Sequence, residues 1–242
     1  VLAGSRRGAE DPMAVHAGVS HKAIIEVGGA PMLVRVARAL CEAGYNRIVV
    51  AIERPDLVDD LRAAGAFPSS VSIEVVAAAE GPSLSVARAL EQLGAPLLVT
   101  TADHALLRPE WVSHFVDHVP AGADVAAGLA RSDVVMAAAP DTKRTFLRFS
   151  DGWFSGCNLF YFATPRARAV VDLWREVEEK RKQPIKLLAR LGPITAVRYA
   201  MGRLSLVEAT QKLGALAGAA VAAVELPFGQ AAIDVDKPED LD

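Results

Sequence analysis

Cysteine and long apolar runs are scarce in this chain of 242 residues, and each shortage excludes a class of protein. The two cysteines, Cys41 and Cys157, provide neither a disulfide framework nor the spacing of a metal site. Although 52% of the residues are hydrophobic, no stretch approaches the roughly 20 consecutive apolar residues that a membrane helix needs. We therefore expect a protein of the reducing cytoplasm that does not cross a membrane.

We also expect no signal peptide at the start of the printed sequence. The apolar residues 1–3 lead directly into Gly4 and two arginines, which is too short for a signal-peptide core. We expect these residues to be the end of a β-strand that is clipped at its beginning. The length suits one large α/β domain better than two, so we expect a single domain over residues 1–242.

The formal net charge of −3 argues against general binding of nucleic acid. The charge is uneven, because residues 166–203 contain ten basic and four acidic residues and carry +6, which leaves −9 for the remainder. A solvated helical face explains this excess, and so does a surface that attracts an anionic acceptor. The candidates for such a surface are Arg166, Arg168, Lys180, Arg181, Lys182 and Lys186.

Short β-branched runs alternate with amphipathic stretches of helical length, which predicts an α/β fold with a mixed, mostly parallel sheet. The expected strands are residues 23–27, 47–52, 72–77, 96–100, 124–129, 145–149, 158–162, 219–226 and 231–235. The expected helices start at Pro31 and cover residues 55–64, 83–93 and 109–119. A helical insertion over about 165–216, with Ser205 as an N-cap, interrupts the second half.

A glycine-containing loop follows the opening strand end. In such a place backbone N–H groups and guanidinium groups can converge on the oxygens of a triphosphate. Lys22, just ahead of the next expected strand, would neutralise charge on a phosphoryl group in transfer. A tight turn with solvated arginines is the alternative explanation. The candidate nucleotide-binding residues of this segment are Leu2, Ala3, Gly4, Ser5, Arg6, Arg7 and Gly8.

Asp103 directly follows the apolar run of residues 96–99, so we expect it outside the carboxyl end of a parallel strand, where open α/β sheets bind ligands. Proteins bind Mg²⁺ through one or two carboxylates together with substrate phosphates. Asp234 or Asp236 would supply the second carboxylate, since strand alternation over 231–235 puts both on one face. Each aspartate would also suit an ordinary helix cap or turn.

In their order and spacing, these residues resemble the nucleotidyltransferases similar to the molybdenum cofactor guanylyltransferase, with their sugar-phosphate and methylerythritol-phosphate cytidylyltransferase relatives. The resemblance covers nearly the whole chain and rests on residues 2–4, Lys22 ahead of 29–33, Asp103, and 234–241. It implies a Rossmann-like sheet of the nucleotidyltransferase and glycosyltransferase-A type, with Lys22 on the phosphates of a nucleoside triphosphate.

The same resemblance implies the chemistry and a metal. Mg²⁺ would be held by Asp103 and a late aspartate, best matched by Asp234. A nucleoside monophosphate would pass to a small, phosphorylated acceptor, with release of pyrophosphate. Two further segments resemble the family. Ser83 and Ser85 would contact the base or ribose, with N-capping as an equal alternative, while Gly156 and Asn158 would contact the acceptor.

The sequence also departs from the family pattern. Ser5 replaces the usual second glycine, and residues 9–21 lengthen the phosphate loop, where His16 and His21 would approach a triphosphate or simply be exposed. A metal-dependent glycosyltransferase of related fold is a rival, although Asp103 lacks a second acid two residues on. An inactive nucleotide-binding module is a second rival interpretation. The sequence does not identify the base of the nucleotide or the acceptor.

Overall fold

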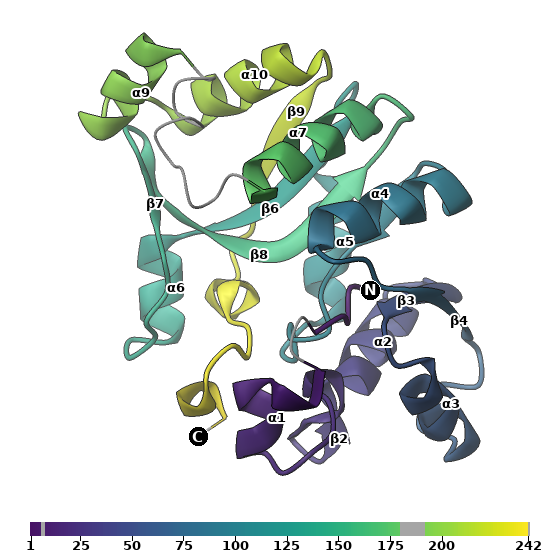
Figure 1. The fold of residues 1–242 in the computed structure, drawn as a ribbon. Coiled ribbons are helices and arrows are strands. Elements are labelled where there is room, and N and C mark those ends of the chain that lie inside the picture. The colour runs from purple at the N-terminus through teal and green to yellow at the C-terminus, as the bar shows by residue number, and fades with distance from the viewer. Residues whose placement is uncertain (6–7, 180–191, 242) are drawn as a thin grey trace.

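A computed structural model of the chain describes residues 1–5, 8–179 and 192–241 (Figure 1). Leu2 bridges to Ala51 and to Thr101 in parallel, so the opening residues lie as a strand end between two strands of the sheet. The order across the sheet is β4 (Ser72–Ala77), β3 (Arg47–Ile52), the opening residues, β5 (Leu97–Val99), β8 (Gly152–Phe162), β6 (Val125–Arg131) and β9 (Val221–Glu225).

Most neighbouring strands along this order are parallel, whereas β8 runs antiparallel to both β5 and β6. The short strand β7 (Leu147–Phe149) pairs with the first half of β8. This arrangement confirms the predicted α/β fold with a mixed, largely parallel sheet.

Helices cover both faces of the sheet. Apolar side chains of α2 (Met32–Glu42) and α5 (Pro109–Asp117) belong to the larger core cluster on one face. On the other face, α4 (Pro82–Leu93) and α7 (Ala167–Glu179) pack in a second cluster, and Figure 1 shows them in front of the sheet. The other α-helices described are α1 (Pro12–His16), α3 (Pro55–Ala63), α6 (Ser132–Ala138), α9 (Pro193–Ala200) and α10 (Leu206–Ala217).

The described part of the predicted insertion is helical, as α7, α9 and α10 show. Ser205 is the expected N-cap. Its side chain accepts the N–H of Glu208, and the Glu208 carboxylate accepts the N–H of Ser205, which forms a capping box at the start of α10.

The strand expected over residues 23–27 is largely wrong. Residues Lys22–Ile24 form a 3₁₀ turn, η2, because the buried ring of His21 accepts the N–H of Ala23 and turns the backbone locally. Only β1 (Glu26–Val27), paired with β2 (Ala30–Pro31), is extended. Before them, Asp11 caps α1, which follows the 3₁₀ turn η1 (Gly8–Glu10).

The strand expected over residues 231–235 is also wrong. A 3₁₀ turn, η3 (Gly229–Ala232), replaces it and packs against α6, a helix that was not predicted. The chain ends in another 3₁₀ turn, η4 (Pro238–Asp240). The contact of η3 with α6 is so close that a Cβ atom on Gly229 would lie 2.2 Å from the carbonyl oxygen of Val134.

This contact predicts a loss of stability when Gly229 is replaced by alanine. The added methyl group would force the backbone of α6 and η3 apart, and overpacking of this kind costs about 1–3 kcal/mol of unfolding free energy. Urea unfolding should show a lower midpoint for Gly229→Ala. Gly156→Ala is the matched control, because no atom of the described residues lies within 4 Å of its added Cβ. Equal midpoints for the two variants would contradict the close packing.

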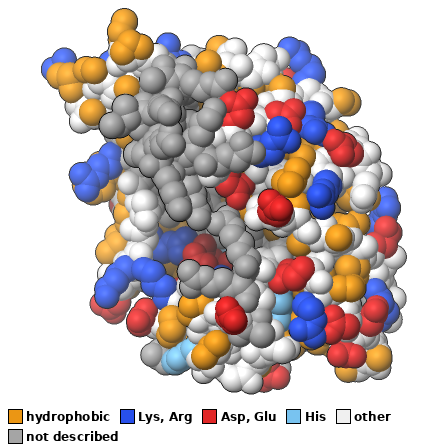
Figure 2. Space-filling view, in the orientation of Figure 1, with side chains coloured by type: hydrophobic (Ala, Val, Ile, Leu, Met, Phe, Trp, Pro, Cys, Tyr) orange, Lys and Arg blue, Asp and Glu red, His pale blue; other side chains and the backbone are white. Residues whose placement is uncertain are grey.

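Within the described residues, no helix has both the length and the apolar composition of a membrane span. Apolar side chains are exposed on α9 and directly after it; they are Ile194, Val197 and Met201. Figure 2 shows hydrophobic side chains at the upper left, where Figure 1 places α9.

Candidate functional site

A pocket of roughly 600 Å³ opens at the carboxyl ends of β3 and β5 and of the opening segment. Gly4 and Ser5 of the first loop line it, together with Glu53 after β3, Ser85 of α4, and Asp103 after β5. The structure thus brings the first loop and Asp103 to one edge of the sheet, as the sequence predicts.

The first loop passes close to the neighbouring chain. A Cβ atom on Gly4 would lie 2.9 Å from the Cβ atom of Ala78, so glycine allows this approach. The N–H of Ser5 donates to the Glu53 carboxylate, with both oxygens at 3.1 Å. Glu53 therefore anchors the loop. It was missed in the sequence analysis, although its place directly after a strand is the same signal that identified Asp103.

His21 is fully buried and supports the same anchor. Its Nδ1 accepts the N–H of Ala23, so Nε2 carries the ring proton and donates to Glu53 Oε1 at 3.0 Å. His21 thus connects Glu53 to the turn that carries Lys22. His16, in contrast, is exposed.

Lys22 lies between two of the predicted aspartates. Its Nζ donates to Asp103 Oδ2 at 2.8 Å and to Asp236 Oδ1 at 2.7 Å. Burial by itself would lower the pKa of Lys22, but the two carboxylates outweigh it and raise the pKa above its usual value. Lys22 is therefore a firmly protonated cation at the pocket edge.

One carboxylate oxygen of Asp103 is not used by Lys22. Its Oδ1 is buried without a hydrogen-bond partner among the described residues. Burial raises the pKa of Asp103 and the Lys22 ammonium opposes that rise. The carbonyl oxygen of Asp103 accepts the N–H of Val235 at 3.0 Å, which holds the late segment of the chain against this site.

Asp234 points inward and is held by two groups. Its Oδ2 accepts a hydrogen bond from Nδ2 of Asn158 at 2.8 Å, and its Oδ1 pairs with the Arg144 guanidinium. Burial opposes ionisation, but these partners prevail and lower the pKa of Asp234. Asn158 has a positive φ of 49°, which asparagine tolerates better than most residues. No sequence motif pointed to Arg144, which lies in the irregular loop between α6 and β7.

Asp234 and Asp236 do not share an environment, because the strand that would have aligned them is absent. The Asp234 side chain is 10% exposed, whereas that of Asp236 is 57% exposed and bonds Lys22. The shared face expected from strand alternation is wrong for this reason.

The donors fit a divalent cation bound together with substrate phosphates. No group of three or more His, Cys, Asp or Glu side chains is placed to hold a metal in residues 1–5, 8–179 and 192–241. Mg²⁺ needs only one or two carboxylates when phosphates supply further oxygens. The unpartnered Oδ1 of Asp103 is such a hard oxygen donor, and Asp234 is close enough to affect its pKa.

Ser83 and Ser85 bond protein groups at the start of α4. The Ser83 hydroxyl donates to Glu178 at 2.6 Å. The Ser85 hydroxyl donates to the carbonyl of Gly81 and accepts the N–H of Ala79. Ser85 thereby shapes the loop that lines the pocket, while contact of either serine with a nucleotide stays a prediction.

Part of the basic segment is already paired. Arg166 donates to the Gly218 carbonyl and lies 3.9 Å from Asp124, and Arg168 pairs with Glu91 and Asp172. These two arginines are thus held in surface contacts. The predictions for Arg6, Arg7, Lys180, Arg181, Lys182 and Lys186 lie outside the described residues.

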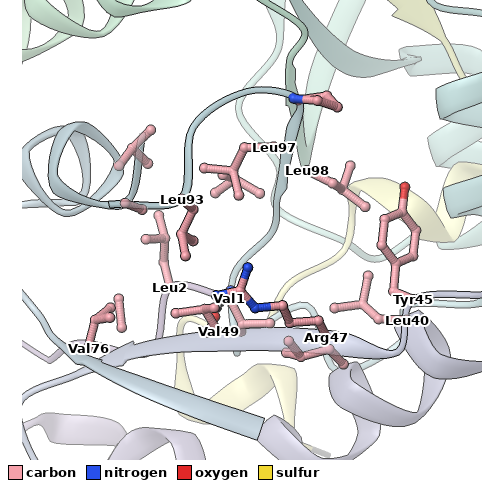
Figure 3. A pocket seen from close by; sticks show the side chains of 16 residues that line it. Val1, Leu2, Leu40, Tyr45, Arg47, Val49, Val76, Leu93, Leu97 and Leu98 are labelled. Atoms are coloured by element: carbon pink, nitrogen blue, oxygen red, sulfur yellow. Dashed lines mark hydrogen bonds between the residues drawn. The ribbon is translucent and has the colours of Figure 1, made fainter. Parts of the chain in front are cut away.

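A second pocket, of about 220 Å³, lies between β3 and β5 beside Val1 (Figure 3). Apolar side chains such as Leu40, Val49 and Leu97 dominate its lining, and Asp103 of the first pocket is not part of it. Its charged side chain, Arg47, is already bonded to Glu74, and no carboxylate of the described residues lines the pocket, so we do not take it as the candidate site.

The fold is that of the nucleotidyltransferases, as solved structures show. A hypothetical transferase from Thermus thermophilus is 30% identical, with a TM-score of 0.82 over 99% of this chain and 96% of the other. Residues 3–181 match the model of the MobA-like NTP transferase domain, and the chain belongs to this family. No curated protein matches.

Two more distant structures share the fold alone. One is 4-diphosphocytidyl-2C-methyl-D-erythritol synthase from Anaerococcus prevotii, 12% identical, with a TM-score of 0.58 over 99% of this chain and 90% of the other. The other is a putative glucose-1-phosphate thymidylyltransferase from Bacillus anthracis, 14% identical, with a TM-score of 0.53 over 93% and 85%.

Proposed function

We propose that this NTP transferase moves a nucleoside monophosphate from a nucleoside triphosphate to a small anionic acceptor and releases pyrophosphate. The observation that carries the proposal is the contact of Lys22 with Asp103 and Asp236 beside the first-loop pocket. A lysine and strand-end carboxylates at one edge are the groups that phosphoryl transfer requires.

In the proposed reaction an acceptor oxygen forms a bond to the α-phosphorus. The bond from this phosphorus to the bridging oxygen breaks, and its electron pair leaves with pyrophosphate. Lys22 stabilises the negative charge that develops on the α- and β-phosphates. An ionised phosphate monoester as the acceptor would need no general base, since it is already a nucleophile near neutral pH. Mg²⁺, held by Asp103 and Asp234, would supply further charge neutralisation.

The neighbouring His104 fits this scheme because it carries no charge of its own. It is fully buried, and burial lowers its pKa to about 4. Its ring stacks on Trp111 at 6.1 Å between centroids, so we assign it to the core.

The two cysteines of the chain are free thiols. Free thiols are usual in a reducing cytoplasm, which supports our expectation that the protein works there.

A pyrophosphate-release screen tests the function. Each of the four common triphosphates is offered with Mg²⁺ and a panel of phosphorylated sugars, polyols and cofactor precursors. We expect pyrophosphate with at least one pair, and none without the acceptor. Release of a free nucleoside diphosphate would instead identify a glycosyltransferase, and no release with any pair would contradict the proposal.

The two late aspartates should differ in their effect on this activity. Asp234→Asn removes the inward carboxylate and should lower kcat by about 100-fold or more, the usual effect of losing one charge-stabilising group. Asp236→Asn leaves Lys22 bound to Asp103 and should cost roughly tenfold or less. Steady-state kinetics at saturating Mg²⁺ would measure both. The reverse ranking would assign the metal to Asp236.

A further inference from the structure

Arg144 is a second, half-buried cation of the site that the proposed reaction does not yet use. Its side chain is 18% exposed and pairs with Asp234, while Lys22 serves Asp103 and Asp236. Its Nε is buried and has no hydrogen-bond partner among the described residues. A buried guanidinium N–H without an acceptor is costly, so its presence points to a ligand that supplies one.

The charge balance of the site changes when a divalent cation binds. The carboxylates of Asp103, Asp234 and Asp236 contribute −3, and Lys22 and Arg144 contribute +2, which leaves −1. A bound divalent cation makes the sum +1. The cation and the Arg144 guanidinium would then compete for Asp234, and the site as a whole would attract an anion.

Arg144 reaches Asp234 from the loop between α6 and β7, in the second half of the chain. The other group on Asp234 is Asn158 of β8, which the sequence predicts to contact the acceptor. Lys22 belongs to the turn Lys22–Ile24 in the first half of the chain and bonds Asp103 and Asp236 instead. The two cations thus come from different halves of the chain and bond different aspartates, and we take Lys22 to serve the triphosphate and Arg144 the acceptor.

We propose that Arg144 is the anion-binding residue of the acceptor side. It neutralises Asp234 in the free enzyme, and it turns to a phosphate or carboxylate of the acceptor when a divalent cation takes Asp234. Its forked guanidinium matches two oxygens of such a group. This inference rests on the proposed function, because only that reaction has an acceptor. Its test measures binding and does not need turnover.

The first measurement is the affinity for Mn²⁺ in the presence of inorganic triphosphate, which supplies phosphate oxygens to the cation, followed by electron paramagnetic resonance. Arg144→Gln removes the competing cation and should tighten Mn²⁺ binding about 5- to 10-fold. Arg148→Gln is the matched control, because Arg148 is an exposed arginine of the next strand that lies over Trp153. The Arg148→Gln substitution should change the Mn²⁺ affinity by less than about twofold. Unchanged Mn²⁺ affinity in folded Arg144→Gln would overturn the proposal.

The second measurement is the binding of inorganic phosphate to the Mg²⁺-loaded protein by calorimetry. Arg144→Gln should weaken this binding about tenfold or more, whereas Arg148→Gln should not. Lys22→Ala removes one positive charge from the site and should weaken the binding less than Arg144→Gln does. If Lys22→Ala abolishes phosphate binding and Arg144→Gln does not, the phosphate binds on the triphosphate side and the proposal fails.

A measurement on the unaltered protein covers the case in which Arg144→Gln does not fold. The arginine Nε–H signals are followed by NMR and assigned with the Arg144→Lys variant. The Arg144 signal should move when Mg²⁺ is added and again when phosphate follows. A signal that responds to neither overturns the proposal. Absence of pyrophosphate release, with these shifts present, would contradict the proposed function and leave the anion site in place.

Discussion

Asp103→Asn is expected to lower kcat by at least about 100-fold, because it removes a charge-stabilising carboxylate from the site. The substitution keeps the shape of the side chain but removes the charge that would hold Mg²⁺ and compensate Lys22. We expect the fold to persist, because the contact with Val235 uses the main-chain carbonyl of residue 103. Pyrophosphate release at saturating Mg²⁺ and the urea midpoint would be measured together.

Asp133→Asn provides the matched control for Asp103→Asn. Asp133 is an aspartate of α6 whose side chain is 73% exposed, and its partner Arg131 lies 3.5 Å away at the surface. Exposed pairs of this kind contribute little, so both turnover and the midpoint should stay near those of the unaltered protein. Wild-type kinetics for Asp103→Asn at saturating Mg²⁺ would show that the site has been assigned wrongly.

Lys22→Ala is expected to affect the chemical step more than nucleotide binding. Its ammonium lies where charge would develop on the α- and β-phosphates, so its contribution should be greatest in the transition state. Single-turnover rates should fall by about 100-fold, while the triphosphate Kd rises by roughly tenfold or less. Rapid-quench measurements at saturating nucleotide, together with a binding titration, would separate the two effects.

Lys143→Ala is the control for Lys22→Ala, since Lys143 is an exposed lysine next to Arg144. It should change neither the single-turnover rate nor the triphosphate Kd by more than about twofold. If Lys22→Ala raises only the Kd and leaves the chemical rate unchanged, Lys22 contributes uniform binding and not transition-state stabilisation.

The regular elements could be predicted where local pattern and packing agree. The predicted bounds of β3 and β4 match those observed, because their β-branched runs pair in parallel over all six residues of each strand. Helices α4 and α5 begin within one residue of the prediction. Two apolar runs were misread as strands. Residues 23–27 are turned by a side-chain cap from His21, and residues 231–235 by close packing of Gly229 on α6.

Strand ends and local spacing are visible along the chain, so the α/β fold and the candidates Lys22, Asp103 and Asp234 could be predicted from them. Which groups meet depends on the packing of distant segments. Lys22 bonds Asp103 and Asp236 across 81 and 214 residues of chain, and Arg144 reaches Asp234 across 90. This packing also placed Glu53 under the first loop and turned Asp234 inward. Such contacts depend on how irregular loops pack against the sheet, and no local periodicity encodes that packing.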